Sequence, residues 1–265
     1  MFLGTSKYLT GIHRRPSDFP KQSMCDKVET YIRWKLLNGE FVGGDKIGEQ
    51  TIAREVDVSR TLVREATRRL FGAGLLEIDS QRGVFVKTFS IGQIQDLIDV
   101  RIALSRLTAR LFVERATLPQ KEKIVSIYSK LEQVRDETYS DNDYFLSLQF
   151  FHEFLKSIKN DRVYFLDREA WQQMRIFKLF LQKKTFGEFD VTAFNRSMFF
   201  QGCQNRARLF EALSVANEDM IAGALQISAK EAQTRALELY QEFLGSKPDT
   251  WNNNIVQGLK NHNKY

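Results

Sequence analysis

The chain has 265 residues, 43% of them hydrophobic, a formal net charge of +6 and two cysteines, so it is long enough for one or two domains with apolar cores. No apolar run approaches the roughly 20 residues that span a membrane and no signal-peptide pattern opens the chain, so we expect a cytoplasmic protein. Cys25 and Cys203 lack metal-ligand spacing, and reduced thiols are expected.

The positive charge is concentrated in the N-terminal third of the chain. Through residue 88 there are 15 Lys and Arg against 11 Asp and Glu, whereas the remaining 177 residues hold 24 against 22. This asymmetry is typical of a DNA-binding module joined to a nearly neutral one. We therefore expect a flexible arm over 1–22, a DNA-binding domain over 23–88, a second domain over 90–247 and a tail over 248–265.

Residues 47–70 predict a helix-turn-helix, preceded by a helix over 28–37. The turn falls at Val58-Ser59, and Ser59 is a suitable N-cap for the helix that follows. At about 100° per residue, the apolar and polar side chains of that helix lie on opposite faces. The apolar face holds Leu62, Val63, Ala66 and Leu70, and the polar face holds Arg60, Thr61, Arg64 and Arg68. An arginine row opposite a buried face suits the DNA major groove, although an ordinary amphipathic helix with a solvated basic face has the same pattern.

A β-hairpin is predicted directly after this helix. Leu75–Ile78 and Gly83–Val86 have the composition of two short strands, joined by a turn over Asp79–Arg82. Arg82 and Gly83 at its tip would lie over phosphate or the minor groove. A helix-turn-helix followed by a basic-tipped hairpin is the element order of a winged helix.

Over residues 25–88 these motifs resemble the GntR family of bacterial transcription regulators, through Gly39–Ile47, Val58–Ala66 and Arg82–Val86. Leu62 stands where the family often has proline, and because it faces inward it should alter packing more than DNA contact. Glu65, amid the basic row, predicts an ion pair with Arg68 or Arg69. The resemblance implies DNA contacts from Gln50, Ser59, Arg60, Thr61, Arg64, Arg68, Arg82 and Gly83, with Arg60 and Arg64 foremost.

The remainder of the chain predicts an all-helical bundle, so the fold class is mostly α, a winged helix-turn-helix plus a helical C-terminal domain. Only Pro119 and Pro248 interrupt the pattern after Ser90, and phenylalanines are concentrated there. The expected helices are 91–116, 120–138, 142–159, 161–184, 189–200, 205–226 and 229–245, with a weaker one over 249–261.

The helix over 94–111 resembles the first helix of the FadR-type (FCD) C-terminal domain, notably at Asp99–Arg101. That resemblance implies a domain that dimerises and senses a small effector, often a carboxylic acid. Arg101 lies within or beside the apolar stripe, and a buried arginine needs an anionic partner. Both an effector carboxylate and a structural ion pair with a neighbouring Asp or Glu satisfy this need.

The same subfamily often coordinates a divalent metal through one Asp and three His. At the corresponding positions this chain has Leu148, His152, Glu218 and Tyr240. One histidine and one glutamate are too few for a firm site, so we predict no metal cofactor. His152 is then expected to hydrogen-bond within an aromatic pocket, with Tyr240 or Glu218 as candidate partners.

Two states of the effector pocket remain open. It could bind a more apolar effector anchored by Arg101 or Arg175, or it could be filled by side chains and have lost its sensor. The candidate effector residues are Arg101, His152, Arg175, Glu218 and Tyr240.

We predict a non-enzymatic regulator, by default a repressor, whose homodimer reads a palindromic operator in double-stranded DNA and responds to a small-molecule effector, with no membrane partner. The alternative is a constitutive DNA-binding protein whose C-terminal domain only dimerises. An enzyme with chemistry around His152 and Glu218 has little support, because the chain offers no nucleophile–His–acid set and no glycine-rich phosphate loop.

Overall fold

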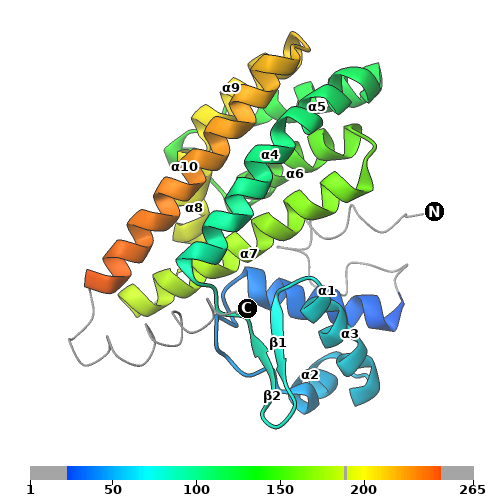
Figure 1. Cartoon of the computed structure of the whole chain (residues 1–265), viewed down its shortest axis with the longest axis vertical. Coiled ribbons are helices and arrows are strands. Elements are labelled where there is room, and N and C mark those ends of the chain that lie inside the picture. Colours follow the sequence, from blue (N-terminus) through cyan, green and yellow to red (C-terminus); the bar gives the residue numbers. More distant parts are fainter. Residues whose placement is uncertain (1–22, 188–189, 246–265) are drawn as a thin grey trace. The chain divides into compact units, whose positions relative to one another are not determined.

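The computed structural model describes residues 23–187 and 190–245. The described chain is mostly helical, with a short β-hairpin (Figure 1). The contacts of these residues divide them into two units. The winged-helix unit comprises residues 23–98, 169–187 and 232–245, and the helical unit comprises 99–168 and 190–231. The mostly α fold class is confirmed. Over the described part of the chain, no helix has the length and apolarity to cross a membrane.

The winged-helix unit contains α1 (Met24–Leu37), α2 (Glu49–Val56), α3 (Arg60–Gly72) and the antiparallel strands β1 (Leu76–Asp79) and β2 (Gly83–Val86). Ser59 Oγ accepts from Leu62 N at 3.4 Å, as predicted for the N-cap of α3. α2 ends at Asp57, whose φ of 53° places it in the left-handed region that short polar side chains tolerate. This residue closes the tight turn between α2 and α3.

The core of this unit is built from the apolar faces of its helices and hairpin. Val63, Ala66 and Leu70 of α3 are fully buried, as their spacing predicts. They pack with side chains of α1, α2 and the hairpin, among them Val28, Ile32, Leu36, Ile52, Leu76 and Val86. The opposite face of α3 is left to solvent.

The second half of α7 (Asp161–Phe186) belongs to the winged-helix unit and supplies donors to the C-termini of two of its helices. Arg175 Nε donates to the carbonyl of Leu37, the last residue of α1, at 2.7 Å. Gln173 Nε2 donates to the carbonyl of Ala73, the C-cap of α3, at 3.2 Å. Terminal helix carbonyls have no intrahelical partner, and a cation there also interacts favourably with the helix dipole.

The helical unit is formed by α4 (Ile91–Arg115) from residue 99, α5 (Leu118–Leu131), α6 (Asp141–Ser157), the first turns of α7, α8 (Val191–Gln201), α9 (Cys203–Ser214) and α10 (Glu218–Gly245) to residue 231. Its core is aromatic, as the concentration of phenylalanine predicts. Phe112, Phe150, Phe154 and Phe199 are each at most 1% exposed. Tyr128 stacks on Phe210 with ring centroids 3.9 Å apart.

Two helix predictions are wrong. The break expected near residues 227–228 lies instead at 215–217, and α10 runs unbroken through Ser228. Ala216 is in the left-handed region with φ of 49°, and Asn217 Oδ1 caps α10 by accepting from Met220 N at 3.0 Å. The helix expected over 120–138 ends at Leu131. The weak helix over 249–261, the arm over 1–22 and the tail over 248–265 lie outside the described residues.

The support given by α7 predicts that Arg175→Met destabilises the protein by about 1–3 kcal/mol, because the buried Leu37 carbonyl loses its donor. Urea unfolding followed by circular dichroism measures this. Lys184→Met is the control, since Lys184 is an exposed cation on the same helix. Equal midpoints for the two variants would contradict the role of Arg175.

Candidate nucleic-acid interface and cavity

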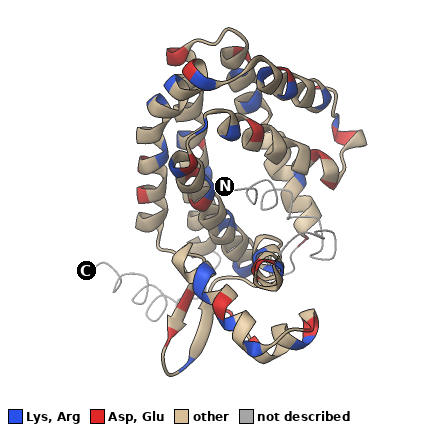
Figure 2. Ribbon diagram, turned by 90° about the vertical axis from the view of Figure 1, so that its right-hand side faces the viewer, with Lys and Arg blue, Asp and Glu red and all other residues tan. Residues whose placement is uncertain are grey.

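The surface predicted to face DNA is accessible. Arg60, Thr61, Arg64 and Arg68 project from the exposed face of α3, and Gln50 and Ser59 are exposed beside its N-terminus. Arg82 is exposed on the hairpin and Gly83 is half-buried. Basic and acidic residues are interspersed along the ribbon (Figure 2), so the partners of each arginine decide which charges are available for a ligand.

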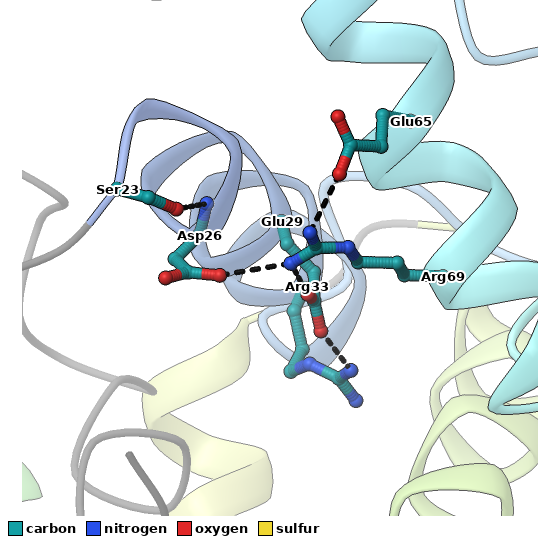
Figure 3. A network of polar contacts seen from close by, with 6 residues as sticks. All are labelled: Ser23, Asp26, Glu29, Arg33, Glu65 and Arg69. Carbon is teal, nitrogen blue, oxygen red and sulfur yellow. Dashed lines mark hydrogen bonds and ion pairs between the residues drawn. The ribbon is translucent and has the colours of Figure 1, made fainter. Parts of the chain in front are cut away.

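The arginines of α3 differ in their partners. Arg64 Nε lies 2.9 Å from Glu49 Oε2 of α2, although its side chain remains 58% exposed. Arg69 pairs with Asp26 at 2.9 Å and with Glu65 at 2.6 Å, which confirms Arg69 as one of the two partners predicted for Glu65 (Figure 3). Arg60 and Arg68 have no ion pair within the described ranges.

Behind this surface, a polar network joins α3 to α1 (Figure 3). The guanidinium of Arg69 also lies 3.8 Å from Glu29, whose other oxygen accepts from the buried Arg33 at 2.7 Å. Arg33 in turn donates to Gln172 of α7. Arg33 and Gln172 are at most 3% exposed, so these contacts replace water around a guanidinium that could not otherwise be buried.

The hairpin turn is fixed by Asp79. Its Oδ1 accepts from the backbone N–H groups of Arg82 at 2.9 Å and Gln81 at 2.8 Å. These donors hold the pKa of the Asp79 carboxyl below its ordinary value. Gly83 follows with a φ of 106°, a conformation that other residues rarely adopt. The turn therefore presents Arg82 at a fixed place.

Helices α2 and α3 are joined by a tight turn, α3 exposes a basic face, and a hairpin with a basic tip follows. This arrangement defines a winged helix-turn-helix DNA-binding module, which we call the reader. Residues 25–86 match the family described as "Bacterial regulatory proteins, gntR family". Residues 25–86 therefore form a DNA-binding domain of the gntR type.

Curated proteins similar in sequence are transcription regulators, and a solved structure shares the fold. The chain is 28% identical over 134 residues to the uncharacterized HTH-type transcriptional regulator YdhC of Bacillus subtilis, covering 49% of this chain and 58% of that protein. It is 23% identical over 225 residues to the HTH-type transcriptional repressor RspR of Escherichia coli, covering 84% and 93%. The fold is similar to that of E. coli McbR/YncC, with 20% identity, a TM-score of 0.65 and coverage of 84% and 99%.

The helical unit contains a cavity of about 30 Å³ between α4, α6, α7 and α10. Arg101 lines it, and Arg101 Nε lies 2.8 Å from Asp167 Oδ1, which also lines it. The structural ion pair that the sequence left open is therefore present. The polar groups of the wall that the sequence did not indicate are Ser105, Thr108 and Ser228.

Of the five candidate effector residues, only Arg101 lines this cavity. Arg175 and Tyr240 lie in the winged-helix unit, where Arg175 caps α1 and the Tyr240 ring packs 6.3 Å from that of Phe243. Glu218 is exposed in the first turn of α10. Four of the five candidates therefore lie outside this cavity, because helical periodicity places a residue on a face without specifying which neighbour that face meets.

His152 is 1% exposed, and its Nδ1 lies 2.9 Å from the hydroxyl of Tyr164. The partner is therefore neither Tyr240 nor Glu218, which corrects that expectation, although an aromatic hydrogen-bonded setting is present. Burial lowers the pKa of His152 below its ordinary value.

The metal implied by the subfamily resemblance does not fit these residues. Leu148 offers no ligand atom, and Nδ1 of His152 faces the phenol of Tyr164. Glu218 is exposed to solvent, and Tyr240 belongs to the winged-helix unit. Within 23–187 and 190–245, no three His, Cys, Asp or Glu side chains are grouped to hold a metal ion. A zinc site uses at least three protein ligands.

The buried imidazole predicts acid sensitivity. The unfolded chain binds a proton at His152 near pH 6.5, whereas the native chain binds it only at lower pH, so stability falls as pH drops below about 6.5, by at most about 1.4 kcal/mol per unit from this group. Urea unfolding of wild type and His152→Gln between pH 7 and pH 5 measures the difference. Tyr164→Phe should keep the pH dependence, because burial is the larger cause.

NMR provides a direct check, since the chain has only three histidines. The His152 signal should titrate below pH 6.5. A His152→Gln variant with the same pH dependence as wild type would contradict the prediction.

Proposed function

We propose that this chain is a repressor that binds a palindromic operator as a homodimer and is released by a small carboxylate effector. The observation that carries the DNA-binding role is the exposed row on α3, in which Arg60 and Arg68 have no ion pair among the described residues. Unpaired guanidinium groups on a recognition helix are available to guanine edges and phosphates. The similarity to RspR supports repression. Because its ligand is genomic DNA, we place the protein in the cytoplasm.

The homodimer is supported by the exposed face of α4. Asp99 and Val100 lie toward one end of this face, Ala103 at its middle, and Arg106 and Arg110 toward the other end, all exposed. A second copy of α4 packed antiparallel around Ala103 would place acidic residues against basic ones on both sides of a two-fold axis. Two recognition helices related by that axis would match the symmetry of a palindrome.

The effector role is supported by the Arg101–Asp167 pair. A carboxylate ligand could replace Asp167 as the counter-ion of Arg101, because both offer the same oxygen geometry to the guanidinium. The cavity has room for about two water molecules as it stands. Ligand entry therefore requires the ion pair to open, and the conformational change is coupled to binding. We propose that this exchange needs no metal.

The small volume of this cavity also supports the constitutive alternative. Side chains already fill most of the space between α4, α6 and α7, and Asp167 already neutralises Arg101. A protein that kept this pair closed would dimerise and bind DNA without a sensor.

The recognition helix is tested by Arg60→Ala and Arg64→Ala. Arg60→Ala should weaken operator binding by about 1–3 kcal/mol. Arg64→Ala should cost less, because Arg64 must leave Glu49 before it contacts DNA. Fluorescence anisotropy with the duplex upstream of the gene measures both.

Arg162→Ala, an exposed arginine of the helical unit, is the control for this experiment. Unchanged affinity in both Arg60→Ala and Arg64→Ala would overturn the assignment of α3 as the reader. Reduced affinity in Arg162→Ala as well would show that charge alone is being measured.

The effector is tested with lactate, succinate and benzoate in thermal-shift and anisotropy measurements. We expect one of these carboxylates to raise the melting temperature and to weaken operator binding. Arg101→Leu should abolish both responses, whereas Asp167→Asn should strengthen carboxylate binding because Arg101 loses its internal counter-ion. Lys130→Leu, an exposed position of α5, is the control. Intact operator binding with no carboxylate response favours the constitutive alternative.

A further inference from the structure

The hairpin carries a second cation that the sequence analysis did not single out. Residues 44–47 run beside β2, with Ile47 N donating to Val84 O and Val86 N donating to Asp45 O, each at 2.9 Å. Lys46 and Phe85 form the bridge pair between these two hydrogen bonds. The backbone of Lys46 is therefore held against the wing by a short ladder, and its side chain is exposed.

Lys46 and Arg82 both lie over the ring of Phe85. Lys46 Nζ is 5.9 Å and Arg82 Cζ is 5.2 Å from the ring centroid. Val84 and Val86 point into the core, so Phe85 lies on the opposite, half-buried face of β2. Gly83 lies beside the Lys46 side chain, since a Cβ built at Gly83 would be 3.4 Å from Lys46 Cε.

Two like charges over one ring repel each other, and an anion beside them offsets that repulsion. Neither cation has an ion pair in the described part of the chain. The positive charge of Arg82 helps to lower the pKa of Asp79, but Oδ1 of Asp79 already accepts hydrogen bonds from two backbone amides. Glu77 is opposite Phe85 in the β1–β2 ladder and makes no ion pair with either cation.

We propose that Lys46 is a DNA-backbone contact, and that Lys46 and Arg82 form a phosphate clamp on the ring of Phe85. A phosphate oxygen accepts from both groups and relieves their repulsion. The clamp reads no base; it fixes the register of the wing while α3 reads the groove. This inference rests on the proposed docking of α3 and the wing on DNA. The competing explanation is that the two cations only cover the apolar ring with their stems.

The test is the salt dependence of binding to a random-sequence duplex, measured by fluorescence anisotropy. Log affinity falls as log salt rises, and each lost phosphate contact makes this negative slope shallower by about 0.9. Over a fourfold rise in salt, Lys46→Gln should therefore lose about 3.5-fold less affinity than wild type for each bound subunit. At low salt, Lys46→Gln should weaken binding to an operator duplex by the same factor as it weakens binding to the random-sequence duplex. Lys46→Arg should restore the wild-type salt slope.

Lys121→Gln is the matched control, because Lys121 Nζ lies 5.7 Å from the ring centroid of Phe112 in the helical unit. It removes the same charge and the same kind of ring contact, and its slope should equal that of wild type. Thermal melting confirms that each variant is folded. A folded Lys46→Gln with the wild-type slope would overturn the clamp and favour the covering role. Absence of salt-dependent binding by wild type itself would instead contradict the proposed function.

Discussion

The winged-helix unit depends on the need of buried helix ends for hydrogen-bond donors. The carbonyls of Leu37 and Ala73 close α1 and α3, and both receive donors from α7. Leaving such groups buried without a partner costs about 1–3 kcal/mol each. The reader is therefore completed by a segment far along the chain, and α7 is part of its fold rather than an addition to it.

This dependence extends to the recognition helix through side chains. Gln172 of α7 accepts a hydrogen bond from Arg33 of α1, and Arg33 pairs with Glu29. Glu29 in turn lies beside Arg69 of α3. The same helix supplies Asp167 to the cavity. Under the proposed function, an effector that displaces Asp167 would act on a helix that also holds the reader. Coupling of this kind requires two arrangements of α7 that the effector and DNA favour differently.

Local signals in the sequence predicted the reader well. Periodicity and the Ser59 cap located α3, and two segments of strand-like composition around a turn located the hairpin, because each signal acts over a few residues. The cavity was predicted less well. The partner of Arg101 is 66 positions away and that of His152 is on another helix, and no local pattern encodes either contact. The helix break at Ala216 was missed because alanine rarely adopts a left-handed conformation.

The partners of the cations also explain why the net charge of +6 does not say which cations are available to a ligand. Arg69 and Arg33 are paired with carboxylates of the same unit, and the Arg33–Glu29 pair is buried. By contrast, Arg60 and Arg68 on α3 and Arg82 on the wing have no ion pair within the described residues. A ligand contact to such a residue would not require an internal ion pair to break first. The division of labour among the arginines thus follows from which of them the fold has left unpaired.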